Sequence, residues 1–293
     1  MGYWATVAAF LCWGVFPLYW KLFHSMSAVE LTAHRVVWGL LCMAPFLIRT
    51  HAGKQWCESF SSLGRIAKGV PSAVFLAINW GVYLWAVING HVLDASLGYF
   101  LVPLLNTALG TLFLGEKLRP TQWFSVLLAT SGVCWMVVLY GKVPWAALAI
   151  AGSWGMYGVI KKGSTVGALA GLAVEMTMMF PFAAFGLAWL HLTGTATVTL
   201  LPVANQWILC TTAGVITVVP LLFFIYGTKR IPLTATGIFQ YLTPSMKFVL
   251  AVLLFNEPFS SHQMMAFAII WTAIVIYITE GIWQMRKRTP VTA

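Results

Sequence analysis

The sequence predicts an all-α integral membrane protein with ten transmembrane helices, arranged as two five-helix repeats of inverted topology. The prediction depends on composition, on the number of long apolar stretches and on an internal repeat. Of the 293 residues, 60% are hydrophobic and 8% are charged, whereas a soluble domain carries roughly 25% charged residues. Because so few charges cannot cover a surface exposed to water, the chain must lie in a membrane.

The repeat is clearest in two matching stretches, Gly98–Glu116 and Phe239–Glu257. Each has a proline near its start, an apolar run and a closing glutamate, and Pro103 and Pro244 are 141 positions apart. The same shift superposes further distinctive residues, Trp13-Gly14 on Trp154-Gly155 and Lys21 on Lys162. Such long-period self-similarity indicates duplicated units. We therefore expect a first repeat over residues 1–141 and a second over 142–293 that ends in a short basic tail.

Ten apolar stretches are long enough to cross the hydrocarbon core, which takes about 20 residues. In chain order they are Gly2–Phe23, Val29–Ile48, Val70–Asn89, Leu93–Leu114, Thr121–Tyr140, Pro144–Ile160, Thr165–Leu192, Val203–Thr228, Leu233–Phe255 and Ser261–Trp283. The first lacks the basic start and small-residue cleavage site of a signal peptide, so we expect it to be a membrane helix. The longest connection, Arg49–Lys68, is polar enough to lie in water or along the lipid headgroups.

Basic residues are concentrated in alternate loops. One set comprises Arg49, Lys54, Arg65, Lys68, Lys117, Arg119, Lys161, Lys162, Lys229, Arg230 and Arg286–Arg288, and the opposite set comprises Lys21 and Lys142. By the positive-inside rule, both termini are cytoplasmic. Because each repeat has five helices, the second enters the membrane in the opposite sense to the first. Inverted repeats of this kind are typical of secondary transporters, whose site lies near the bilayer midplane.

Ionisable residues inside the apolar stretches include His34, Arg35, Glu175 and Lys247. A charge in hydrocarbon costs at least about 2.5–3.5 kcal/mol, so these groups should face the protein interior or a wet cavity. Arg35 and Lys247 are candidates to bind an anionic or zwitterionic solute, and Glu175 or His34 to carry a coupling proton. The structural alternatives are an Arg35–Glu175 ion pair between the repeats, Arg35 reaching the headgroups, and a purely interfacial His34.

Amides and aromatic residues at similar depth complete the predicted solute site: Asn79, Trp80, Tyr99, Asn106, Gln240 and Tyr241. Each of them, taken alone, is more often an interhelical contact than a ligand contact. Tyr99 and Gln240 occupy equivalent repeat positions, four residues before Pro103 and Pro244. Proline bends a helix by leaving one carbonyl without its donor. We therefore expect these two prolines to act as gates, the alternative being that they only shape packing.

The two five-helix repeats, with Trp-Gly in each first helix, resemble the EamA domains of the drug/metabolite transporter superfamily. Closer likeness to its RarD-like branch lies in HRVVW at 34–38, NW at 79–80, WAVINGHVLDASLGYFLVPLLN at 85–106, FLGE at 113–116, TVVPLL at 217–222 and FQYLTP at 239–244. The resemblance covers nearly the whole chain. It implies a bacterial inner-membrane permease with a central cavity lined by the first four helices of each repeat. It does not specify the solute.

The sequence therefore predicts a secondary transporter that moves a small amphipathic metabolite or drug by alternating access. A lipid flippase of the same fold is the alternative. An integral-membrane enzyme is least favoured, because HExxH, GxSxG and Walker motifs are absent from the sequence. We expect no cofactor, no metal and no nucleic acid partner, since the five cysteines form no CxxC and the basic residues form no single patch. Membrane lipids are expected partners, and a homodimer is left open.

Overall fold

The computed structural model describes residues 1–114, 119–139, 142–162, 164–200, 203–228, 230 and 239–288, and the regular structure within these ranges is all helical. In chain order the elements are α1 (Gly2–Trp20), η1 (Lys21–Phe23), α2 (Ala28–Arg49), α3 (His51–Ser59), α4 (Leu63–Ile88), α5 (Val92–Leu114), α6 (Pro120–Leu139), α7 (Trp145–Lys162), α8 (Ala168–Leu192), η2 (Thr197–Leu200), α9 (Val203–Thr228), α11 (Leu242–Val249), the π-helical η3 (Leu250–Leu254) and α12 (Ser261–Arg288). Each of the ten predicted stretches overlaps a helix.

In the described part of the chain, five segments are long and apolar enough to cross a membrane. They are Gly2–Phe23, Ala28–Arg49, Leu63–Ile88, Leu169–Leu192 and Ser261–Trp283, and shorter apolar helices add to them. Large apolar side chains such as Phe182, Phe185 and Leu192 are mostly exposed, as expected for side chains that face lipid. The chain is thus an all-helical, multi-pass membrane protein.

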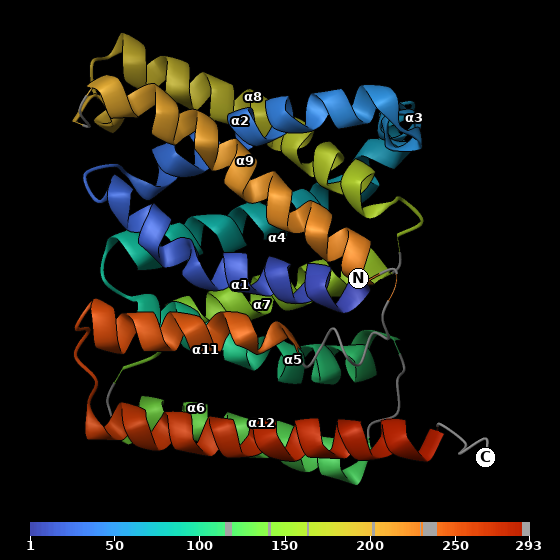
Figure 1. Ribbon diagram of the computed structural model, residues 1–293, viewed down its shortest axis with the longest axis vertical. Helices are drawn as coiled ribbons and strands as arrows, with labels where there is room; N and C mark the ends of the chain where they lie inside the picture. Colours follow the sequence, from blue (N-terminus) through green and yellow to red (C-terminus); the bar gives the residue numbers. More distant parts are fainter. Residues whose placement is uncertain are drawn as a thin grey trace.

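The helices are stacked in layers (Figure 1). α2, α8 and α9 lie at one end of the long axis, α6 and α12 at the other, and α1, α4, α7, α5 and α11 lie between. The packing partners form matched sets. α1 packs against α9 and α11, and its equivalent one repeat later, α7, packs against α4 and α5. α2 and α8 pack on each other, as do α6 and α12. Exchanging the two halves of the chain therefore leaves this packing pattern unchanged.

Short polar signals set the helix ends. Ser27 and Ser62 begin α2 and α4, where their side chains accept from the backbone N–H of Glu30 and Arg65, respectively. Such caps satisfy amide groups that have no partner inside the helix. Gly90, directly after α4, has a φ of +75°, a conformation that favours glycine. These signals place the polar turns at the ends of the apolar helices.

The glutamate that closes the second matching stretch has a structural role. Both carboxylate oxygens of Glu257 accept from backbone N–H groups at the start of α5, at 2.8 Å from Val92 and 2.9 Å from Leu93. Asn256 allows this turn because asparagine tolerates its φ of +50°. The second half of the chain thereby caps a helix of the first half, so the two halves are joined at this end.

Candidate functional site

A cavity of about 160 Å³ lies among helices from both halves of the chain. We call it the central cavity. It is lined by Phe10, Trp13, Phe16, Arg35, Leu76, Asn79, Trp80, Tyr83, Tyr99, Trp154, Tyr157, Leu172, Thr217, Leu221, Phe224, Gln240, Thr243, Pro244 and Lys247. These residues come from α1, α2, α4 and α5 and from α7, α8, α9 and the α11 region, which are the helices that the family resemblance implies.

Six residues of the predicted solute site meet at this cavity: Arg35, Asn79, Trp80, Tyr99, Gln240 and Lys247. They come from both halves of the chain, between positions 35 and 247, and α2, α4, α5 and the α11 region bring them together. The prediction that the buried cations face the interior is borne out, since Arg35 is 6% and Lys247 is 3% exposed.

Arg35 is held on three sides. Its Nε donates to Thr217 Oγ1 at 2.9 Å. Its guanidinium carbon lies 4.0 Å from the centre of the Trp80 ring and 5.4 Å from that of Trp20, distances at which an aromatic face attracts a cation. The terminal nitrogen Nη1 is buried and has no hydrogen-bond partner among the described residues.

Lys247 sits between two tyrosine rings. Its Nζ lies 4.1 Å from the ring centre of Tyr83 and 3.8 Å from that of Tyr99. Tyr99 donates from its hydroxyl to Asn79 Oδ1 at 3.3 Å, whereas the buried Tyr83 hydroxyl has no partner in the described part of the chain. The rings stabilise the ammonium group without neutralising it.

Asn79 holds the cavity wall together. Its Nδ2 donates to the backbone carbonyl of Ile150 at 3.0 Å and to Ser153 Oγ at 3.2 Å, both on α7. Because the Tyr99 hydroxyl donates to Oδ1, both the oxygen and the nitrogen of the Asn79 amide have hydrogen-bond partners. Asn79 therefore joins α4 to α7 and positions Tyr99, a structural task that the sequence left open beside the binding role.

The charge of the central cavity is unbalanced. Its described lining includes Arg35 and Lys247 and no aspartate or glutamate. None of the ion pairs found in the described ranges includes either cation. Because buried charges are normally paired, two unpaired cations on one cavity wall indicate a site for a negatively charged group.

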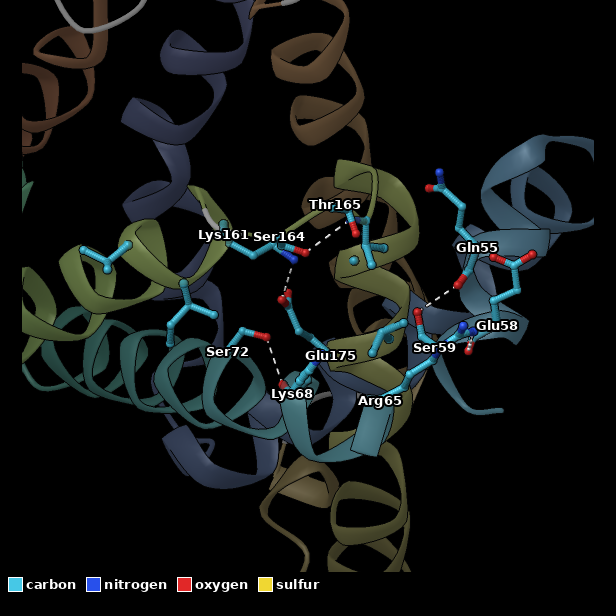
Figure 2. A pocket seen from close by; sticks show the side chains of 16 residues that line it. Gln55, Glu58, Ser59, Arg65, Lys68, Ser72, Lys161, Ser164, Thr165 and Glu175 are labelled. Atoms are coloured by element: carbon cyan, nitrogen blue, oxygen red, sulfur yellow. Dashed lines mark hydrogen bonds and ion pairs between the residues drawn. The ribbon is translucent and has the colours of Figure 1, made fainter. Parts of the chain in front are cut away.

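Glu175 does not line the central cavity. It lines a second cavity, of about 690 Å³, at the ends of α7 and α8 and beside α3 and α4. Figure 2 shows Lys161 directed at Glu175, with Gln55, Glu58 and Arg65 on the far side of this second cavity. Lys161 was predicted to lie in a loop, but it belongs to the last turn of α7, and its Nζ lies 2.7 Å from Glu175 Oε1.

The proposed Arg35–Glu175 ion pair does not form, since Glu175 pairs with Lys161 and Arg35 bonds to Thr217. The Tyr157 hydroxyl donates to Glu175 Oε2 at 3.0 Å, and Tyr157 also lines the central cavity. The side chain of Tyr157 thus lies between the two cavities. This tyrosine connects Glu175 to the central cavity.

Of the other predicted residues, His34 and Tyr241 are not among those that line the central cavity. His34 is 6% exposed, belongs to neither cavity lining, and has no partner for either ring nitrogen in the described structure. Tyr241 is buried beside the lining and stacks on Phe100, with 6.5 Å between ring centres. The side chains of Pro103 and Asn106 lie outside the described residues.

Pro244 lines the cavity within the first turn of α11. At that position a missing N–H leaves no intrahelical bond unmade. Its carbonyl accepts from Ser96 Oγ at 2.7 Å. The helical irregularity that the sequence attributed to Pro244 lies on either side of it, at the turn of Tyr241 and in the π-helical η3.

Comparison with known proteins gives a consistent assignment. The profile of the EamA-like transporter family matches residues 1–138 and again 142–279. A Vibrio cholerae protein named as an uncharacterized transporter is 40% identical over 283 residues, 94% of this chain and 91% of that protein. The Bacillus subtilis uncharacterized transporter YojE is 38% identical over 97% of this chain and 96% of its own. Protein RarD of Escherichia coli is 35% identical over 96% of this chain and 95% of its own.

A solved crystal structure has a similar fold. It aligns with 96% of this chain and 98% of its own, with a TM-score of 0.60 and 22% sequence identity. At that identity the likeness concerns the fold alone. The resemblance noted in the sequence is confirmed by the family profile and by the relatives.

Proposed function

This chain belongs to the EamA-like transporter family, and from that premise we propose that it is a secondary active transporter. It moves a small amphipathic solute, anionic or zwitterionic, across the bacterial inner membrane by alternating access. The observation that carries the proposal is the central cavity, where helices from both halves of the chain present Arg35 and Lys247 without a described carboxylate. Solute sites of transporters lie at such repeat interfaces.

The proposed architecture is ten membrane crossings in two inverted repeats, residues 1–141 and 142–293, with both termini in the cytoplasm. The matched packing partners support two equivalent halves. The N-terminal end of α1, the C-terminal end of α12 and the short helix α3 lie on the same side of the bundle (Figure 1). An even number of crossings requires the termini to share one side, and the basic loops assign that side to the cytoplasm.

Within the central cavity, Arg35 and Lys247 attract the solute, and Trp80, Tyr99 and Gln240 form its walls. Tyr241 and Asn106 stand as further proposed contacts. The halves rock about the Pro103 and Pro244 helices. The helix that contains Pro244 is irregular at Tyr241 and in the π-helical η3. Helices bend at such irregularities, so this helix can change its angle there.

Glu175 is the proposed coupling group, with His34 as the weaker candidate. Lys161 balances the charge of the Glu175 carboxylate and Tyr157 connects it to the central cavity. Protonation of Glu175 would remove the attraction to Lys161 and leave the ammonium free to turn into the second cavity. A change at Glu175 would thereby reach the solute site through Tyr157.

The test is transport by the purified protein in liposomes. A thermal-shift screen of amino acids, organic acids, amines and nucleosides first selects a solute, since a ligand that binds only the folded state raises its apparent stability. Uptake of that solute is then compared for wild type, Arg35→Gln, Arg35→Lys and the control Arg49→Gln, which removes an exposed charge from the same helix. We expect Arg35→Gln to insert normally without transporting, and Arg49→Gln to transport as wild type does.

Normal transport by Arg35→Gln would contradict the assignment of the site. Translocation of a labelled phospholipid that depends on Arg35, with no solute uptake, would favour the flippase alternative. The same liposomes serve for both measurements.

A further inference from the structure

We propose that Arg35, Tyr83 and Lys247 form an oxyanion site for the carboxylate of a small organic acid that carries no ammonium group. The proposal rests on the transporter function above and narrows its solute from anionic or zwitterionic to anionic. It also gives a ligand contact to Tyr83, which was not among the predicted site residues.

Three donor groups on the cavity wall have no acceptor among the residues that the structure describes. Arg35 Nη1 and the Tyr83 hydroxyl are buried without a hydrogen-bond partner in the described residues, and the contacts found for Lys247 Nζ are the rings of Tyr83 and Tyr99. Arg35, Tyr83 and Lys247 all line the central cavity. Since buried donors are rarely left unpaired in folded proteins, three in one cavity point to an acceptor supplied by a ligand.

The neighbouring polar groups are already committed to the protein. Tyr99 donates to Asn79, and the Asn79 amide donates to α7. Thr217 bonds to Arg35 and to the backbone carbonyl of Ala213, and the Thr243 hydroxyl donates to the carbonyl of Phe10 at 2.8 Å. Arg35 Nη1, the Tyr83 hydroxyl and Lys247 Nζ therefore present donors, which complement a carboxylate with its two acceptor oxygens.

The net charge of the solute decides whether the central cavity prefers an organic acid or an amino acid. A carboxylate reduces the excess of two positive charges from Arg35 and Lys247, whereas a zwitterion leaves it unchanged. The ammonium group of a zwitterion would also need its own partner, and the described lining holds no carboxylate for it. Placing a third cation within a few ångströms of two others in a poorly hydrated cavity is unfavourable.

The rest of the solute must be compact and apolar. The central cavity has about 160 Å³, and a cavity of about 150 Å³ in another protein holds a benzene molecule. The apolar part of its lining includes Trp13, Trp154, Leu221 and Phe224. A carboxylate on a ring or on a short branched chain fits both the volume and the walls.

Binding of matched small molecules to the wild-type protein in detergent tests the charge rule without any substitution. Benzoate, benzamide and benzylamine share a ring and differ in charge, and 3-methylbutanoate differs from valine by the absence of the ammonium group. We expect benzoate and 3-methylbutanoate to raise the unfolding temperature and to give measurable dissociation constants by calorimetry. Benzamide, benzylamine and valine should bind at least about tenfold more weakly, the factor that one lost charge-assisted hydrogen bond gives.

Tyr83→Phe removes the hydroxyl but keeps the ring beside Lys247. We expect benzoate to bind about tenfold more weakly to this variant, with the preference for benzoate over benzamide reduced. Lys247→Met should abolish that preference. The matched controls are Tyr226→Phe on the exposed face of α9 and Lys54→Met on α3, both outside the two cavity linings. A change in packing alone would alter the stability of Tyr83→Phe but not its discrimination between benzoate and benzamide.

Equal binding of benzoate and benzamide by wild type, or unchanged benzoate affinity in Tyr83→Phe, would overturn the oxyanion site. The two proposals fail differently. Arg35-dependent uptake of valine or benzylamine, without uptake of benzoate, would leave the transporter standing and remove the oxyanion site. Tight benzoate binding with no uptake of any solute would keep the oxyanion site and remove the transporter.

Discussion

Replacing Lys161 by methionine leaves the carboxylate of Glu175 buried without its counter-ion. The pair is asymmetric, because the side chain of Lys161 is 22% exposed and that of Glu175 is 1% exposed. Glu175 is therefore far more dependent on its partner for compensation of its charge than Lys161, which can turn into the second cavity when Glu175 is lost. The two single substitutions should have unequal effects on stability.

The distance of 2.7 Å between Lys161 Nζ and Glu175 Oε1 determines how strongly the two charges attract. At an effective dielectric constant of about 20, two unit charges at this distance attract by about 6 kcal/mol before the cost of desolvation. Removing one partner of a buried pair typically costs about 3–5 kcal/mol, so we expect Lys161→Met to lie in that range. For Glu175→Gln, which keeps an acceptor for Tyr157, we expect a loss of about 1–2 kcal/mol. The double variant should be less destabilised than the sum by about 2 kcal/mol.

The assay is equilibrium unfolding of the four proteins in one detergent, followed by tryptophan fluorescence. Lys68→Met is the matched control, because Lys68 lines the same cavity and takes part in none of the described ion pairs. Additive effects within about 0.5 kcal/mol would show that the ion pair contributes no coupling energy and would refute the reasoning.

Three further substitutions test separate contacts. A methyl group on Gly171 would lie 2.3 Å from Lys161 Nζ, so Gly171→Ala should displace the ammonium from Glu175 and lower uptake in liposomes. Asn79→Leu removes the acceptor of the Tyr99 hydroxyl and the amide that joins α4 to Ile150 and Ser153 of α7, so its unfolding free energy should fall by about 1–3 kcal/mol. Burial raises the pKa of the Glu257 carboxyl above its ordinary value of 4.5, against the opposing effect of its two backbone hydrogen bonds. A raised pKa of an acid in the folded state stabilises the protein below pH 4.5, and this contribution is lost as the pH rises above that value. The free energy of unfolding of the wild type should therefore fall as the pH is raised from below to above 4.5. Glu257→Gln should not show this fall.

The positions of the helices could be predicted because apolar length and polar ends are both local properties of the sequence. The stretch expected at Ser261–Trp283 begins where α12 begins. The helix α3 was not predicted, since its nine residues are polar and too short to show a clear period. It is anchored by a tertiary contact, a hydrogen bond of 3.0 Å from Trp56 Nε1 to Thr177 Oγ1 of α8.

The buried cations could be predicted because a charge inside an apolar stretch is costly wherever the chain folds. Tyr83 could not be identified in this way, because tyrosine is common in membrane helices and only the three-dimensional structure shows that its hydroxyl has no partner. Lys161 was assigned to the cytoplasmic loops because the positive-inside rule counts charges and not side-chain directions. Its long flexible side chain reaches back to Glu175.

The two cavities differ in how their charges are compensated, and this difference suggests a division of roles. Glu175 has a cation at 2.7 Å and a hydroxyl donor at 3.0 Å, so its charge is satisfied within the protein. Arg35 and Lys247 have aromatic faces and one threonine, which leave their charges unmatched. Arg65 and Lys68 of the second cavity are exposed, so solvent screens their charges, and an external anion gains more from the buried cations of the central cavity. Tyr157 contacts both sites, because it lines the central cavity and its hydroxyl donates to Glu175. A solute in the central cavity and the Lys161–Glu175 pair therefore share this side chain as a neighbour.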